Sequence, residues 1–182
     1  MWTKTTSLLP ITANGILLAE PVTNTTPAVT ISHPPVSLLH AANPVMRRVL
    51  RTPLLGGLRD QMMVVDVVGR KTGRRYSIPL CAHQIDGAIY AMTSARWKFN
   101  FRGGADAHVL HNGSTTAMRG ELIDDSAVVA DLAHRTAQAY GVRRAQRMMG
   151  LEFRDGRVPA LADFADVVKR EHYFAIRFTP AA

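Results

Sequence analysis

The stretch from Met62 to Gln84, MMVVDVVGRKTGRRYSIPLCAHQ, carries the two patterns that decide the fold. Met62 to Val68 and Tyr76 to Gln84 are short runs rich in apolar and β-branched residues, a composition typical of strands. Between them lies a turn of glycines and cations, Gly69 to Arg75. The stretch therefore predicts two strands joined by a basic hairpin turn.

Similar strand patterns continue along the chain. Asp86-Gly87 and Asn112-Gly113 are dipeptides that favour tight hairpin turns, so each predicts a hairpin between its flanking runs. Near the end, Phe174, Ile176 and Phe178 alternate with other residues as in a half-buried strand. The further strands are expected at Ala88 to Thr93, Ala107 to His111, Thr115 to Ile123 and Tyr173 to Thr179.

Few helices accompany these strands. Asn43-Pro44 predicts a helix start, with the helix reaching about Thr52. Asp125 or Ser126 can cap a second helix that stops at Gly141, and Val142 to Met149 continue as another. About six strands with few helices predict a mainly β fold with flanking helices, a small α+β barrel and not a parallel sheet of βαβ units.

The length and composition predict one folded domain, residues 44–182, preceded by an extension. The chain has 182 residues, of which 47% are hydrophobic. Residues 1–43 are rich in Thr and Pro and hold only Lys4 and Glu20 as charged residues, so we expect a flexible leader. The alternative is that translation begins downstream of this segment.

The charge and cysteine content set broad limits on partners and compartment. A formal net charge of +8 favours an anionic partner, with phosphates, membrane headgroups and nucleic acid all candidates. Cys81 is the one cysteine, so the chain has no intrachain disulfide, and its apolar surroundings predict a buried thiol. With no signal-like or membrane-spanning run, we expect a cytoplasmic protein and leave peripheral membrane contact open.

Two basic stretches suggest where an anion binds. Arg70, Lys71, Arg74 and Arg75 place four cations between and beside two glycines, an arrangement suited to cradling a phosphate. The alternative is a solvated turn whose charges only aid solubility. The second stretch, Arg96 to Gly104, interleaves cations with aromatic residues that either stack on a planar ring or fill the core.

Together these motifs resemble the deazaflavin-dependent nitroreductase and quinone reductase family of actinobacteria. The residues that carry the resemblance are Gly69-Arg70-Lys71-Thr72-Gly73, then Pro79-Leu80, and then Trp97 with Asn100 three residues on. The resemblance spans about Asn43 to Ile123. It implies a split β-barrel of the flavin-reductase type that binds coenzyme F420, an 8-hydroxy-5-deazaflavin with a phosphate and a polyglutamate tail.

The resemblance also implies which residues bind this cofactor. The basic turn meets the anionic tail, the following strand lines the cofactor, and the end of the third strand with the Trp-x-x-Asn segment completes the pocket. Many relatives have an arginine where this chain has Tyr76, with Arg75 beside it. The matching positions are Arg70, Lys71, Thr72, Arg75, Tyr76, Ser77, Ile78, Pro79, Leu80, Cys81, Thr93, Ser94, Ala95, Trp97 and Asn100.

The activity that follows is an F420-dependent reductase passing hydride to a small quinone, nitro or enone acceptor. Tyr76 and Ser94 are the candidate proton donors, and His83 is a third that is better explained as a structural residue. The Trp97 ring either walls the cofactor or packs in the core, and the Asn100 amide either bonds the ring or holds the loop. No metal site is predicted, because His108 and His111 fall on opposite faces of a strand.

Two other functions remain open from the sequence. The same barrel could hold flavin mononucleotide or haem, as an oxidoreductase or carrier of another kind. A non-enzymatic binder of nucleic acid or anionic membranes is disfavoured, because the cations concentrate at two turns and do not form a long stripe. We therefore expect no nucleic-acid partner, and either a monomer or a homodimer.

Overall fold

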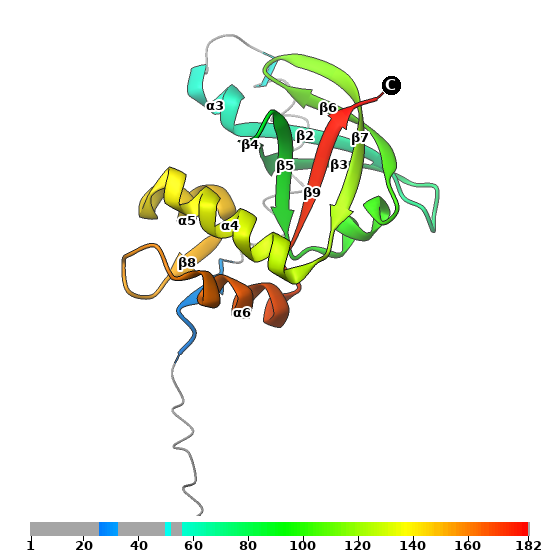
Figure 1. The fold of residues 1–182 in the computed structure, drawn as a ribbon. Coiled ribbons are helices and arrows are strands. Elements are labelled where there is room, and N and C mark those ends of the chain that lie inside the picture. Colours follow the sequence, from blue (N-terminus) through cyan, green and yellow to red (C-terminus); the bar gives the residue numbers. More distant parts are fainter. Residues whose placement is uncertain (1–25, 33–49, 52–55, 182) are drawn as a thin grey trace, which may run out of the picture.

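An antiparallel sheet of seven strands forms the main body of the molecule, in the order β3-β2-β6-β7-β9-β5-β4 (Figure 1). The computed structural model describes residues 26–32, 50–51 and 56–181. The strands of this sheet are β2 (Met62–Val68), β3 (Arg75–Cys81), β4 (His83–Ile85), β5 (Ala88–Thr93), β6 (Ala105–His111), β7 (Ser114–Ile123) and β9 (Phe174–Pro180).

The two edge strands of this sheet, β3 and β4, are joined by a single residue, Ala82. In a flat sheet, six inter-strand spacings would separate them by about 28 Å. Cys81 and His83, however, are only two residues apart, a reach of about 7 Å. The sheet must therefore curl until its edges meet, and it forms the predicted split barrel.

The break at Ala82 corrects the prediction of one continuous strand from Tyr76 to Gln84. The Ala82 amide donates to the Gln61 carbonyl, 2.9 Å away, at the end of α3 (Gly56–Gln61). This bond takes the chain out of the β2–β3 ladder and turns it toward β5. Apolar content alone does not reveal the break, because strand residues continue on both sides of it.

The two predicted hairpin turns are confirmed. Asp86 and Gly87 have φ values of 50° and 77°, and Asn112 and Gly113 have φ values of 50° and 81°. Two successive left-handed residues match the twist of the flanking strands, and Asp-Gly or Asn-Gly adopts this conformation at least cost. The turns fix the register of β4 with β5 and of β6 with β7.

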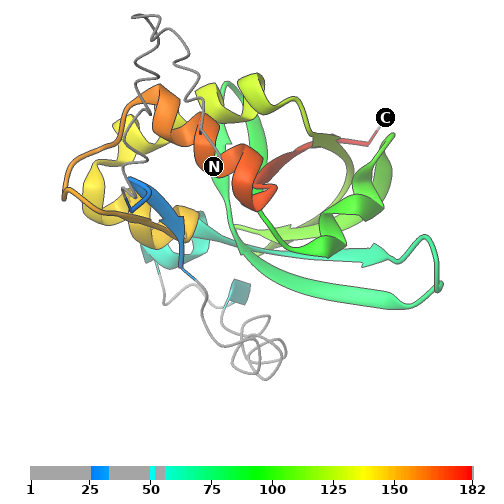
Figure 2. The same cartoon turned by 90° about the horizontal axis from the view of Figure 1, so that it is seen from below.

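Three helices form a second layer beside the barrel: α4 (Ser126–Tyr140), α5 (Val142–Met149) and α6 (Leu161–Glu171) (Figures 1 and 2). Asp125 caps α4, since its Oδ1 accepts from the amides of Ala127 at 2.9 Å and Val128 at 3.1 Å. The first two helices were predicted. Helix α6 was not, nor was the 3-10 helix Arg96–Phe101 that follows β5.

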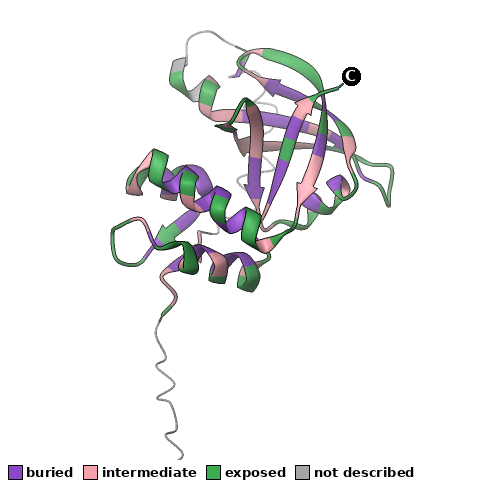
Figure 3. Cartoon of the chain, in the orientation of Figure 1, coloured by how far each residue is buried: buried purple, intermediate pink, exposed green. Residues whose placement is uncertain are grey.

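Strands β5 and β9 contribute to two hydrophobic cores, and Figure 3 shows that parts of both strands are buried. Ala91 and Ile176 face the barrel interior, where they join residues of β2 and β6. Their neighbours Met92 and Ala175 face the helices and pack with residues of α4 and α6. Because successive strand residues point to opposite faces, each of these strands contributes to both cores where it passes the helices.

Residues 26–32, predicted to belong to a flexible leader, are part of the folded unit. Strand β1 (Val29–Ile31) pairs antiparallel with β8 (Leu151–Phe153) beside the helices. Val29 is 1% exposed and packs in the helical core, and its carbonyl accepts from Arg170 at 2.7 Å. Each strand is only three residues long, too short for its alternation of apolar and polar residues to predict a strand.

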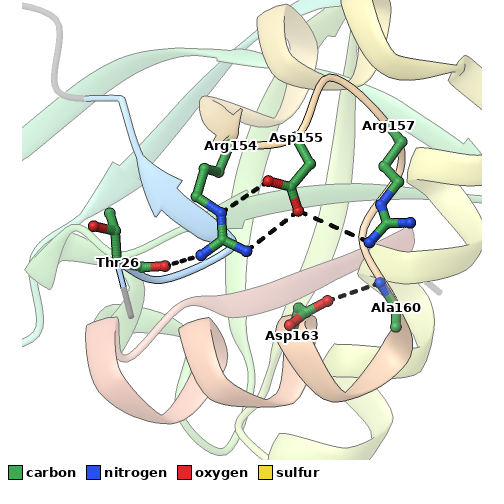
Figure 4. Close-up of polar contacts among 6 residues, drawn as sticks. All are labelled: Thr26, Arg154, Asp155, Arg157, Ala160 and Asp163. Carbon is green, nitrogen blue, oxygen red and sulfur yellow. Dashed lines mark hydrogen bonds and ion pairs between the residues drawn. The ribbon is translucent and has the colours of Figure 1, made fainter. Parts of the chain in front are cut away.

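A polar network holds the entry to β1 (Figure 4). The Arg154 guanidinium donates to the Thr26 carbonyl and binds Asp155 through two bonds, of 2.9 and 3.2 Å. Arg157 lies 3.9 Å from the same carboxylate. The loop after β8 therefore secures the first described residues of the chain.

One remaining expectation concerns the helix that precedes the barrel. The helix expected from Asn43 to Thr52 falls largely outside the described residues, of which Leu50 and Arg51 are helical. Leu50 is buried against Val64 and Leu110 on the outer face of the barrel.

Among the described residues, no helix is long and apolar enough to cross a membrane.

Replacing Val29 tests whether β1 belongs to the folded unit. We expect Val29→Ala to lower the free energy of unfolding by about 2 kcal/mol, because it removes buried methyl groups and leaves a cavity. The measurement is urea denaturation of the full chain. Thr30→Ala on the same strand is the matched control, and an equal effect of the two variants would contradict the packing of β1.

Candidate functional site

The basic turn and the 3-10 helix Arg96–Phe101 are held together by hydrogen bonds. The Arg70 amide donates to Asn100 Oδ1 at 3.1 Å, and the Arg70 guanidinium donates to the Arg102 carbonyl. Asn100 Nδ2 donates to the Trp97 carbonyl at 2.9 Å. Both ends of the Asn100 amide are therefore used within the protein, which favours the loop-holding role over direct bonding to a ring.

The turn itself is closed by backbone bonds. The Gly69 amide donates to the Arg74 carbonyl at 2.8 Å, and the Gly73 amide donates to the Gly69 carbonyl at 2.9 Å. The Tyr76 ring lies so close over Gly69 that a Cβ there would be 2.6 Å from its Cε2. Glycine is thus needed at position 69 for the Tyr76 ring to lie against the turn.

An open cleft of about 770 Å³ lies between the turn and the 3-10 helix. It combines cations and aromatic rings from two segments far apart in the sequence. Figure 2 shows the β2–β3 hairpin reaching out from the barrel toward the 3-10 helix. The residues that line the cleft are Gly69, Arg70, Lys71, Thr72, Tyr76, Arg96, Trp97, Phe99, Asn100 and Arg102.

The cations at this cleft differ in how far the protein itself uses them. Arg102 lies 3.6 Å from the Asp124 carboxylate and 5.0 Å from the Phe99 ring centre, so its charge is partly engaged. Within the part of the chain that the structure describes, no ion pair joins a carboxylate to Lys71 or Arg96 of the cleft, or to Arg74, which belongs to the turn but does not line the cleft. These three side chains are exposed and remain available to an anionic ligand.

The aromatic residues connect the cleft to the barrel core. Trp97 packs edge-on against Phe101 at 6.1 Å between ring centres, and Phe101 against Phe178 at 5.4 Å. Trp97 therefore both lines the cleft and packs on the core, so the two roles considered for it are combined. Tyr76 and Phe99 are 38% and 39% exposed, so part of each side chain is accessible to a ligand in the cleft.

Comparison with known proteins finds only distant likenesses to solved structures. No protein-family model matches the chain, and no curated protein matches it. It is similar to the solved structure of the conserved hypothetical protein Rv2991 from Mycobacterium tuberculosis, with 13% identity and a TM-score of 0.40 over 72% of this chain and 82% of that one. It is also similar to a NimC/NimA family protein from Clostridium acetobutylicum, with 9% identity and a TM-score of 0.38 over 78% and 82%. Likenesses at these scores carry no argument, and the split barrel rests on the strand order and the connection at Ala82.

Six of the residues predicted to bind a cofactor line this cleft. They are Arg70, Lys71, Thr72, Tyr76, Trp97 and Asn100. Three further lining residues with side chains, Arg96, Phe99 and Arg102, were absent from the predicted set. The sequence did point to these three residues, because all three belong to the basic and aromatic stretch Arg96 to Gly104 that contains the Trp-x-x-Asn motif.

The predicted residues of β3 do not share one face. Ile78 and Leu80 pack on the barrel core, whereas Arg75 and Ser77 line a second, outer cleft of about 710 Å³ with Asp66 and His108. Strand alternation causes this separation. The remaining two residues are Pro79 and Cys81, both half-buried, and burial raises the pKa of the Cys81 thiol.

The segment after β5 lies behind the cleft wall. Thr93 Oγ1 accepts from the Ala95 amide at 3.1 Å, and the Ser94 carbonyl accepts from Lys98 Nζ at 2.9 Å. None of Thr93, Ser94 and Ala95 is among the residues that line the cleft. Lys98 is buried and does not line it either, so the basic stretch contributes fewer free cations than its composition suggested.

His83 occupies a structural position away from the cleft. Its side chain is 1% exposed, and Nδ1 shares a hydrogen bond of 3.1 Å with the Tyr140 hydroxyl. Burial, with a smaller effect from the nearby Arg144 charge, lowers the pKa of His83 to about 4. The ring is therefore neutral near pH 7, which agrees with the structural interpretation and not with proton donation.

The buried His83 predicts a specific acid sensitivity. Between pH 6.5 and 4 the unfolded chain binds a proton on this ring and the native protein does not, so stability falls as pH falls through this window. The expected loss is roughly 3 kcal/mol of unfolding free energy. Urea denaturation of the wild-type protein and of His83→Gln across this range measures it.

We expect the slope of unfolding free energy against pH to flatten in His83→Gln. His108→Gln serves as the control, because His108 is exposed on β6. Parallel slopes for wild-type protein and His83→Gln would contradict the neutral, buried state of His83.

Proposed function

We propose that the protein is an oxidoreductase that uses reduced deazaflavin coenzyme F420 to transfer hydride to a quinone, nitro or enone acceptor. The observation that carries the proposal is the bonding of Arg70 to Asn100 and Arg102, which joins the two halves of the sequence motif in one cleft. The sequence resemblance supplies the identity of the cofactor. The residues that line the cleft can be compared with the chemical groups of this cofactor.

The residues present fit a planar ring that carries anionic groups. Lys71 and Arg96 offer charges in the cleft that no described carboxylate neutralises, and a flexible lysine beside arginines suits phosphate or carboxylate groups. Tyr76, Trp97 and Phe99 add aromatic side chains to the same cleft. We assign the anionic tail to the turn and the ring system to the aromatic side.

The chemistry of hydride transfer would come from the cofactor, and the protein would bind, orient and protonate. Trp97, fixed against Phe101, would hold the ring plane from the core side. Tyr76 Oη is the candidate donor of the accompanying proton, because Tyr76 lines the cleft and Ser94 does not. A water molecule is the alternative source.

Titration of the purified full chain with F420 tests the proposal. We expect saturable binding that Lys71→Gln weakens roughly tenfold, because one charge-assisted hydrogen bond to the tail is lost. Lys169→Gln removes the same charge from the exposed face of α6 and should bind as the wild-type protein does. Binding is measured by the change in deazaflavin fluorescence during the titration.

Parallel titrations with flavin mononucleotide, haem and generic duplex DNA separate the alternatives. Saturable binding of flavin mononucleotide or haem alone would overturn the choice of cofactor. A salt-dependent shift of DNA without binding of any small molecule would favour an anion-binding protein without redox activity.

Tyr76→Phe tests the proton donor. The variant keeps the ring over Gly69, so F420 binding should be unchanged. Single-turnover oxidation of the reduced coenzyme by a quinone should slow by roughly a hundredfold if the phenol donates the proton. Ser94→Ala is measured in parallel, and equal rates for wild-type protein and both variants would leave water as the donor.

A further inference from the structure

Lys98 is buried to an extent unusual for a lysine. It is 1% exposed, although it lies in a basic stretch of the sequence, where solvent-exposed side chains are expected. Its Nζ donates to the Ser94 carbonyl at 2.9 Å and to the His172 carbonyl. Backbone carbonyls from two distant segments therefore hold the ammonium group.

Two aromatic rings complete the surroundings of this ammonium group. Lys98 Nζ lies 4.6 Å from the centre of the Phe174 ring and 5.2 Å from that of Phe99. Rings at such distances attract a cation through their electron-rich faces. Among the described residues, no carboxylate forms an ion pair with Lys98.

The groups that Lys98 joins belong to three different parts of the fold. Ser94 follows β5, Lys98 itself is in the 3-10 helix, and His172 ends α6. His172 has a φ of 50°, a left-handed conformation uncommon for a residue with a side chain. The carbonyl bound by Lys98 thus comes from a constrained helix end, which is a fixed point for the 3-10 helix.

A second side chain of the 3-10 helix, that of Asn100, binds the basic turn. Asn100 accepts from the Arg70 amide at 3.1 Å and donates to the Trp97 carbonyl at 2.9 Å. Lys98 lies between Trp97 and Asn100 in the sequence. The 3-10 helix is therefore tied to the helical layer by Lys98 and to the basic turn by Asn100.

We propose that Lys98 is a positioning residue of the cleft, holding the 3-10 helix on the His172 end of α6 so that Asn100 can bind the basic turn. Lys98 does not line the cleft, so it acts through Asn100 and Arg70 and not on the ligand. Burial lowers the pKa of Lys98 to about 8, in keeping with an ammonium group that few water molecules reach. Only the identity of the ligand rests on the proposed function.

The first experiment needs no ligand. Amide hydrogen exchange of the full chain is compared between wild-type protein, Lys98→Met and the control Lys169→Met on the exposed face of α6. We expect the Arg70 amide to exchange at least tenfold faster in Lys98→Met and the β6–β7 amides to be unchanged. An unchanged Arg70 amide, or an equal rise across β6 and β7, would overturn the positioning role.

The second experiment measures F420 binding at several salt concentrations. We expect Lys98→Met to raise the Kd about tenfold while the dependence of Kd on salt stays as in the wild-type protein, because no charge facing the ligand is lost. Lys71→Gln should reduce that salt dependence. A reduced salt dependence in Lys98→Met would mean direct contact with the ligand and would overturn the inference.

Two further measurements keep the outcomes distinct. If the wild-type protein does not bind F420, the proposed function fails while the exchange experiment still decides the role of Lys98. If Lys98→Met does not fold, the Nζ hydrogens of the wild-type protein are observed by NMR. Slowly exchanging Nζ hydrogens are expected, and exchange as fast as at an exposed lysine would overturn the buried contacts.

Discussion

The one-residue connection at Ala82 is the constraint on which the rest of the structure depends. It joins strands that lie at opposite edges of the sheet, so the sheet has to curl and cannot stay flat. Curling gives the sheet an inside, filled by Val65, Ala91 and Ile176, and leaves β5 and β9 to support the helices on their outer side. It also leaves β3 as an edge strand, so the β2–β3 hairpin reaches past the body of the barrel with its basic turn at the tip.

Such a projecting hairpin needs support, and the same contacts that support it form the cleft. The Arg70 amide binds Asn100 of the 3-10 helix, and the Arg70 guanidinium binds the carbonyl of Arg102, the residue that follows this helix. Trp97 and Phe101 in turn anchor that helix on the barrel core through edge-on packing. The shape of the candidate site therefore follows from how the barrel supports this projecting hairpin, and a local change in either segment should affect the other.

The sequence predicted features encoded within a few residues and missed those that depend on distant ones. Asp86-Gly87, Asn112-Gly113 and the Asp125 cap were readable because each turn or cap is satisfied locally. The break at Ala82 was missed because its cause is a bond to Gln61. Strand β1 was missed because Val29 becomes a core residue only beside β8, which lies more than a hundred residues later in the sequence.

The candidate site shows the same division, with charge as the instructive case. Six predicted residues do line the cleft, but residues of β3 were grouped by sequence position, and alternation sends Arg75 and Ser77 to a different surface. The number of cations in the two basic stretches does not distinguish Lys71 from Lys98. The first is exposed without a described partner, and the second is buried on two carbonyls and two rings. A positive charge near a site can thus serve the ligand or the chain, and burial and hydrogen-bond partners distinguish the two where composition does not.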